Sequence, residues 1–256
     1  MKIFKISAVF LCIAFSVIFV IAAVMFIKQI VTDVMINDSV ATMAFNVKYG
    51  DSAAVRGVPA VKQKSNGGYA CIEMLAEYLG KTITEEMLEE ENNGRNSVST
   101  NGGLWVELQK QFPEFKITQY KNLKNSEMLE KIYDSLANNM PVIFAYAAPE
   151  TAHAENAAAE TETETKTETV WKMYYGIAVE IDLQEDKVIF NNTQGYVEKY
   201  AVNDFLKATR YENYENMEFH LRLGFAIETF AKNTLFILES PESEQEEETG
   251  ETEETE

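Results

Sequence analysis

The stretch that decides the fold runs from Val58 to Lys81 and reads VPAVKQKSNGGYACIEMLAEYLGK. Its first part contains Pro59, which restricts the preceding residue to an extended conformation. Its second part, from Tyr69 to Leu79, is typical of a helix, and Gly80 follows it as a C-cap glycine would. The apolar residues that recur there at helical spacing are Ile72, Leu75 and Leu79. The stretch therefore predicts an extended segment, a polar loop and a buried helix.

The chain downstream of this helix contains further helical patterns and then a series of strands. The patterns predict helices at 84–91, 103–112, 126–138 and 202–209, and strands at 115–120, 141–146, 170–182, 187–190, 196–201 and 234–238. The first residue of the 126–138 helix, Ser126, is a typical N-cap. Residues 217–230 are ambiguous, with a helix preferred. Helices followed by strands indicate an α+β domain at 55–239 with a mainly antiparallel sheet.

The N-terminus predicts a membrane anchor at residues 1–30. Ile6 to Ile27 is an uncharged run of 22 residues, which as a helix spans roughly 33 Å and is long enough to cross a bilayer. Lys2 and Lys5 precede the run, which weakly favours an extracellular C-terminal domain on a single-pass anchor. Residues 31–54 would form a stalk. The alternative is a cleaved signal peptide, in which case the protein is secreted.

The acidity of the chain is concentrated in two segments. The net charge is −19, and residues 239–256 contain ten Glu with no Lys or Arg. Residues 150–168 add six Glu and one Lys in a repeated Glu-Thr pattern. Such segments cannot bury enough apolar surface to fold, so we expect a disordered insertion at 147–169 and a disordered tail at 240–256. The remaining body is nearly neutral and offers no basic patch for nucleic acid.

Cysteine and histidine are too rare to suggest a metal site. The two cysteines are Cys12 in the apolar run and Cys71 in the body, and the two histidines are His153 and His220. No spacing among them matches a metal-binding pattern, and no Gly-rich phosphate loop is present. The sequence therefore predicts neither a metal nor a cofactor.

The opening stretch resembles the C39-like cysteine peptidases, which include the bacteriocin-processing enzymes. Their pattern places a Gln before a short loop, then Cys-Gly-Pro-Ala, a Met one turn into the helix and Tyr-Leu-Gly at its end. The matching residues here are Gln63, Gly68, Ala70, Met74, Tyr78, Leu79 and Gly80. A second, weaker match places Tyr174 where the family has a His and Asn192 where it has an Asp. The resemblance covers residues 57–210 and implies a papain-like fold, with a helix packed on an antiparallel sheet.

The same resemblance implies that the chain does not cleave peptides. It puts the nucleophile position at Gly67, which has no side chain, and the base position at Tyr174, whose ordinary pKa near ~10 is poorly suited to base catalysis. The expected remnant of the cleft consists of Gln63, Gly67, Gly68, Tyr174 and Asn192. The resemblance therefore favours a pseudoenzyme at the cell envelope that binds a peptide or protein partner.

Two alternatives remain open at the level of sequence. In the first, Cys71 is a relocated nucleophile of an active peptidase, with His153 or His220 as its base. In the second, the domain is a structural envelope protein whose cleft is filled by the side chain of Tyr69 or Tyr174.

Overall fold

The computed structural model describes residues 2–40, 43, 49–50, 52–150, 169–226 and 230–240. Two predicted features, the bulk of the acidic insertion with His153 and almost the whole acidic tail, lie outside the described residues. The helices are α1 (Lys2–Ile36), α2 (Gly67–Tyr78), α3 (Glu85–Glu91), α4 (Asn101–Gln111), α5 (Asn125–Ala137), α6 (Val202–Thr209), the short 3₁₀ helix η4 (Tyr214–Asn216) and α7 (Phe219–Ala226). The strands are β1 (Ala53–Ala54), β2 (Lys116–Tyr120), β3 (Val142–Pro149), β4 (Trp171–Asp182), β5 (Lys187–Asn192), β6 (Val197–Tyr200) and β7 (Leu235–Glu239).

The strands form one seven-stranded sheet in the order β2-β7-β3-β4-β5-β6, with β1 added to β4. Every pairing between these strands is antiparallel. The long central pair β3–β4 extends from Val142 opposite Ala178 to Pro149 opposite Trp171. The predicted α+β class with a mainly antiparallel sheet is therefore confirmed.

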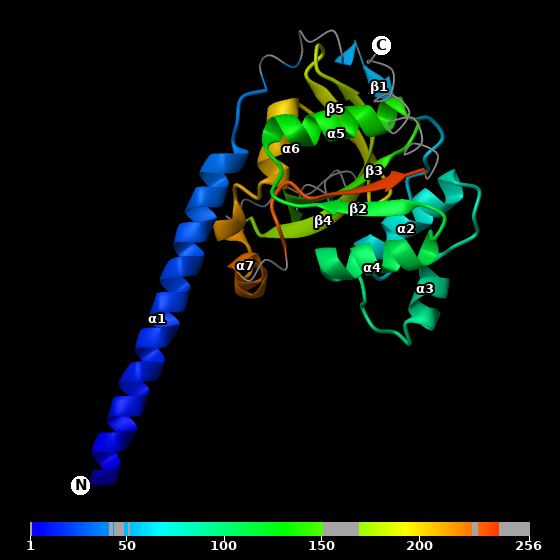
Figure 1. The fold of residues 1–256 in the computed structure, drawn as a ribbon. Coiled ribbons are helices and arrows are strands. Elements are labelled where there is room, and N and C mark those ends of the chain that lie inside the picture. The colour runs from blue at the N-terminus through cyan, green and yellow to red at the C-terminus, as the bar shows by residue number, and fades with distance from the viewer. Residues whose placement is uncertain are drawn as a thin grey trace, which may run out of the picture.

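Helices cover both faces of the sheet. Figure 1 shows α5 and α6 on one face and α2, α3 and α4 on the other. Side chains alternate between the faces along each strand, so the residues of β4 divide between two cores. Tyr175 and Ile177 join the core under α2 and α4, whereas Ala178 and the partly buried Tyr174 join the core under α5 and α6.

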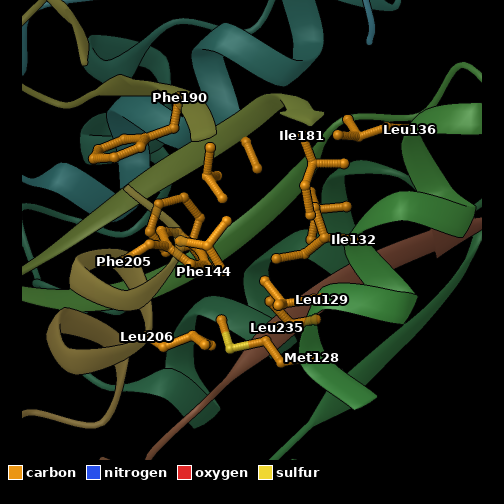
Figure 2. Close-up of a cluster of buried hydrophobic side chains, with 14 of the residues drawn as sticks. Met128, Leu129, Ile132, Leu136, Phe144, Ile181, Phe190, Phe205, Leu206 and Leu235 are labelled. Carbon is orange, nitrogen blue, oxygen red and sulfur yellow. The ribbon is translucent and has the colours of Figure 1, made fainter. Parts of the chain in front are cut away.

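The core under α5 and α6 is closely packed and aromatic. Phe144 lies at its centre, with ring centroids 5.1 Å from Phe190 and 4.9 Å from Phe205. Aliphatic residues of α5 close the other side, and Figure 2 shows Leu129 and Ile132 facing the sheet. This face is an ordinary hydrophobic core that fixes the position of β4.

Helix α1 projects from the domain and is long and apolar enough to cross a membrane or to act as a signal sequence. Its residues 13–36 form a span of 24 residues with mean hydropathy 2.4, and none of the most apolar window is buried. Figure 1 shows the helix extending away from the sheet, with its N-terminus remote from the domain.

The C-terminal end of α1 is packed onto the domain, at a place where the sequence predicted a stalk. Ile36 is only 2% exposed, and Asn37 Oδ1 accepts a hydrogen bond from Arg210 Nη1 at 2.9 Å. Asp38 Oδ1 accepts the Ser126 N–H at 3.0 Å, and Asp38 also accepts from the Ser126 hydroxyl. The prediction that Ser126 caps α5 is therefore wrong: Ser126 is inside the helix, and a carboxylate distant in sequence satisfies its N–H.

The structure also corrects the predicted start of the acidic insertion. Residues 147–149 belong to β3, and Ala147 and Ala148 are each 1% exposed. They are small apolar residues paired with β4, at Met173 and Lys172. The predicted boundary at residue 147 is therefore too early, because the strand continues through the small residues that precede the Glu-Thr repeat.

Candidate functional site

A buried carboxylate shapes the loop that leads into α2. Glu85 is 1% exposed, and its two oxygens accept the backbone N–H groups of Lys64, Ser65 and Asn66 at 2.7, 2.7 and 2.6 Å. The Ser65 hydroxyl also donates to Glu85 at 2.8 Å. These N–H groups therefore point at Glu85, and the loop is held as a tight rim at the start of α2.

Helix α2 begins at this rim, at Gly67. Asn66 is its N-cap, and the Asn66 side chain accepts the N–H of Gly68 at 2.8 Å. Gly67 is half-buried, so solvent reaches the first turn, where backbone N–H groups and the helix dipole favour acceptors and negative charge. Gly68 lies deeper, because a Cβ there would be 2.7 Å from Val98.

A cavity of about 450 Å³ lies in front of this helix end. Its polar lining includes Gln63, Asn66, Asn96, Ser99, Thr193 and Glu218, and its other walls include Gly67, Val98, Met173, Tyr174, Tyr175, His220 and Phe230. The walls come from the α2 rim, the loop before α4, the start of β4 and the α7 segment. The volume falls in the range typical of ligand pockets.

Gly67 is in close contact with Gln63 and Thr193, so a side chain at residue 67 would have to displace them. A Cβ at Gly67 would lie 2.9 Å from Gln63 Oε1 and 3.1 Å from Thr193 Oγ1. Thr193 is 1% exposed, and its hydroxyl has no hydrogen-bond partner among the described residues. Buried hydroxyl groups are normally paired. The part of the cavity next to the Thr193 hydroxyl is therefore suited to a polar ligand atom.

The alternation of β4 places Tyr174 on the sheet face that packs under α5 and α6, opposite to the face under α2. The ring centroid of Tyr174 lies 5.8 Å from that of Tyr146, its cross-strand partner in the α5 and α6 core. Tyr174 also forms part of the cavity wall. On the α2 face the neighbouring position is Tyr175, whose hydroxyl donates to Asn101 Oδ1 at 3.0 Å.

Asn192, unlike Tyr174, is not part of the cavity lining. It is 1% exposed, and its Oδ1 accepts the N–H groups of Gln194 and Tyr196, each at 2.9 Å. Its Nδ2 donates to Glu198. Asn192 therefore holds a turn, and Thr193, the next residue, reaches the Gly67 position instead. Of the five predicted cleft residues, the structure brings Gln63, Gly67 and Tyr174 to the cavity.

Neither tyrosine is suited to accept a proton at neutral pH. Burial, reinforced by the charges of Glu150 and Glu198, raises the pKa of Tyr174 to about 12. Burial also raises the pKa of Tyr175 well above its usual range. Both phenols therefore stay neutral and act as hydrogen-bonding or packing groups.

Cys71 is remote from solvent. It is fully buried in the core under α2 and α4, and burial raises the pKa of its thiol. Since a thiolate is the reactive species, this thiol is unreactive in the folded chain. His220 lines the cavity, and its Nδ1 lies 3.1 Å from Glu218 Oε2, whereas Cys71 is absent from the cavity wall.

The described part of the chain contains no group of three or more His, Cys, Asp or Glu residues arranged to hold a metal ion. The important residues that sequence reasoning missed are Thr193 and Glu85. Thr193 directly follows the predicted Asn192, in the turn after β5, and lines the cavity that Asn192 does not reach. No family model matches the sequence, and no curated protein matches it.

Proposed function

We propose that this chain is a membrane-anchored, papain-like pseudopeptidase of the C39-like kind, which binds a peptide or protein partner at the cell envelope without cleaving it. The observation that carries the proposal is the open cavity at the α2 N-terminus. The resemblance puts the nucleophile position there, at Gly67, and the adjacent Thr193 hydroxyl has no hydrogen-bond partner among the described residues. A helix packed on an antiparallel sheet agrees with the implied fold.

The cavity offers the groups that an extended peptide needs. Peptide carbonyl groups accept hydrogen bonds, and the first turn of α2, the Thr193 hydroxyl and the Gln63 amide can donate them. Met173, Val98 and Leu221 supply apolar wall for a side chain. A peptide would lie in the cavity in front of Gly67, against the half-exposed Gln63 side chain.

Cleavage is not expected because no activated nucleophile is found among the described residues that line the cavity. Gly67 has no side chain, and no described base is hydrogen-bonded to the Thr193 hydroxyl. A hydroxyl needs an adjacent base to attack a carbonyl. The Cys71 alternative lacks support, because its thiol is buried.

The alternative in which the Tyr69 side chain fills the cleft also lacks support. This side chain is 1% exposed, and its hydroxyl bonds to the Arg95 carbonyl oxygen at 3.0 Å and to Ser97 Oγ at 2.8 Å. It therefore lies beneath the loop before α4 and outside the cavity lining.

Peptide binding is best tested on the full chain in nanodiscs. Short random peptides are selected by phage display, and their affinities are measured by fluorescence anisotropy. Gly67→Leu puts a bulky side chain at the cavity wall against Gln63 and Thr193, and should weaken the binding of selected peptides by roughly tenfold or more, equivalent to about 1.4 kcal/mol. Gly102→Leu is the matched control, because a Cβ at Gly102 meets no atom within 4 Å. Failure to select any saturable binder, or equal binding to both variants, would overturn the proposal.

The non-catalytic part of the proposal is tested on the same sample. Intact mass spectrometry should show uncut peptides after long incubation, and iodoacetamide should leave Cys71 unmodified until the chain is unfolded. An adduct on Cys71 in the folded chain, with cleavage that disappears in Cys71→Ala, would establish the active peptidase instead.

A further inference from the structure

Helix α7 exposes large apolar side chains on one side. Phe219 is 76% exposed and Leu223 is 51% exposed. Because they are four residues apart in a helix, they lie next to each other on its surface. Arg222 and His220 are exposed beside them. Two adjacent bulky apolar groups are thus exposed beside a cationic Arg222 and a polar His220, side chains that suit the boundary between lipid and water.

The position of α7 along α1 supports this reading. Met25, Lys28 and Gln29 of α1 enclose a small cavity together with Phe225 and Phe230 of the α7 segment. Figure 1 shows α7 beside α1 at the lower edge of the domain. The helix is therefore held against a defined level of α1, close to Lys28.

Lys28 marks the level of the membrane surface. It is the first charged residue after the 22 uncharged residues from Ile6 to Ile27. A charge is costly in the hydrocarbon region, so Lys28 belongs at the headgroups. Any element that packs on α1 at Lys28 is consequently at the headgroup level too.

We propose that α7 is an interfacial helix whose Phe219 and Leu223 side chains insert into the lipid surface around α1. The proposal rests on the part of the proposed function that treats α1 as a membrane anchor, and it does not depend on peptide binding. A lipid surface is the occupant that the position favours, because the contact with α1 already places the exposed face of α7 at the depth of the headgroups.

The consequence for the cavity follows from shared residues. Glu218, His220 and Leu221 line the cavity in front of α2, and Phe230 lines both that cavity and the small one against α1. An interfacial α7 therefore puts one wall of the binding cavity at the membrane surface. The ligand class deduced from this placement is a peptide segment that lies close to the bilayer.

The test uses the full chain in liposomes that contain a dibrominated phosphatidylcholine, a short-range quencher of tryptophan emission. Phe219→Trp and Leu223→Trp each add one indole to the exposed side of α7. The matched control is Gln184→Trp, in the exposed turn after β4. That turn is at the opposite end of β4 from Trp171, which bridges to Met217 near α7. With about 3.3 Å per residue, the two ends of β4 are roughly 36 Å apart.

We expect the brominated lipid to remove most of the emission added at 219 and 223, and to leave the emission added at 184 unchanged. Trp105 and Trp171 contribute the same background to every variant. Flotation of the liposomes reports insertion of α1 separately. A chain that floats with unquenched emission at both 219 and 223 overturns the α7 proposal alone, whereas a chain that does not float overturns the anchor as well. Two tryptophan positions keep the test valid if one substitution prevents folding.

Discussion

The two faces of the sheet are built differently, although the same strands supply both. Under α5 and α6 the packing is dry: Phe144, Phe190 and Phe205 interlock (Figure 2). Under α2 and α4 an equally apolar core stops short of the helix N-terminus and leaves a cavity, where the buried Thr193 hydroxyl has no partner in the described part of the chain. Both cores therefore contribute to stability, and the edge of the second carries features that packing alone does not require.

The loop around Glu85 strengthens this contrast. A buried carboxylate with three backbone donors is an expensive way to close a loop, because a charge is removed from water. Its effect is to fix the rim from Lys64 to Asn66, beside the Gly67 position. The cavity is thus bordered by a rigid edge, which is what a binding site for an extended ligand needs.

The largest expected effect is a loss of stability after a substitution in the core under α5 and α6. Phe144→Ala removes the ring that contacts Phe190 and Phe205, and should lower the free energy of unfolding by about 3–5 kcal/mol. Chemical denaturation followed by circular dichroism in detergent measures this loss. Val106→Ala on α4, where the side chain is 56% exposed, is the control and should shift stability by less than about 0.5 kcal/mol. A similar small loss for Phe144→Ala would mean that this core contributes little to stability.

An intermediate effect is expected at the rim of the cavity. Glu85→Ala leaves the three N–H groups and the Ser65 hydroxyl without their acceptor, which should cost about 1.5–3 kcal/mol. The same substitution should weaken peptide binding, because the loop from Lys64 to Asn66 loses the hydrogen bonds that fix its conformation. Glu86→Ala removes a neighbouring exposed carboxylate that pairs with Lys64 and should leave both properties unchanged. Weakened binding in Glu86→Ala but not in Glu85→Ala would contradict the assigned role of the rim.

The smallest effect concerns the face to which Tyr174 belongs. Its pKa in the folded chain is about 12, against about 10 in an unfolded chain. The folded state therefore holds the phenol proton more tightly, so this contribution to stability is complete below pH 10 and is lost as the pH rises toward 12. Thermal unfolding should show a decrease in stability over this range that is shallower in Tyr174→Phe. An unchanged slope would indicate that Tyr174 is solvated in the cavity and does not pack on Tyr146.

Sequence patterns predicted elements better than they predicted the site. Helix α6 has the predicted bounds 202–209, because Phe205 and Leu206 pack inward from an otherwise polar stretch and give a clear period. Strand β4 was also predicted, but not which of Tyr174 and Tyr175 faces α2. Both faces of β4 are covered by helices, so apolar residues do not alternate with polar ones along it. The sequence pattern therefore does not show which sheet face each side chain occupies.

Contacts between distant parts of the sequence were also beyond prediction. Asp38 accepts the N–H of Ser126 across a separation of 88 residues, and Glu85 accepts from a loop 19 to 21 residues earlier. Each carboxylate had an ordinary local explanation, as part of a stalk or of the first turn of a helix. Only the tertiary fold reveals which N–H groups they satisfy.

The docking of the α1 end has a mechanical consequence. Asn37 and Asp38 are bonded to α5 and to Arg210, and Asp33 pairs with Lys232. A flexible tether would let the domain explore a volume that grows with linker length, whereas this junction holds the domain in one orientation. Under the proposed anchoring, the cavity moves over the bilayer at a constant height. A membrane-bound partner would then be selected by the length of chain between its own point of insertion and the segment that enters the cavity.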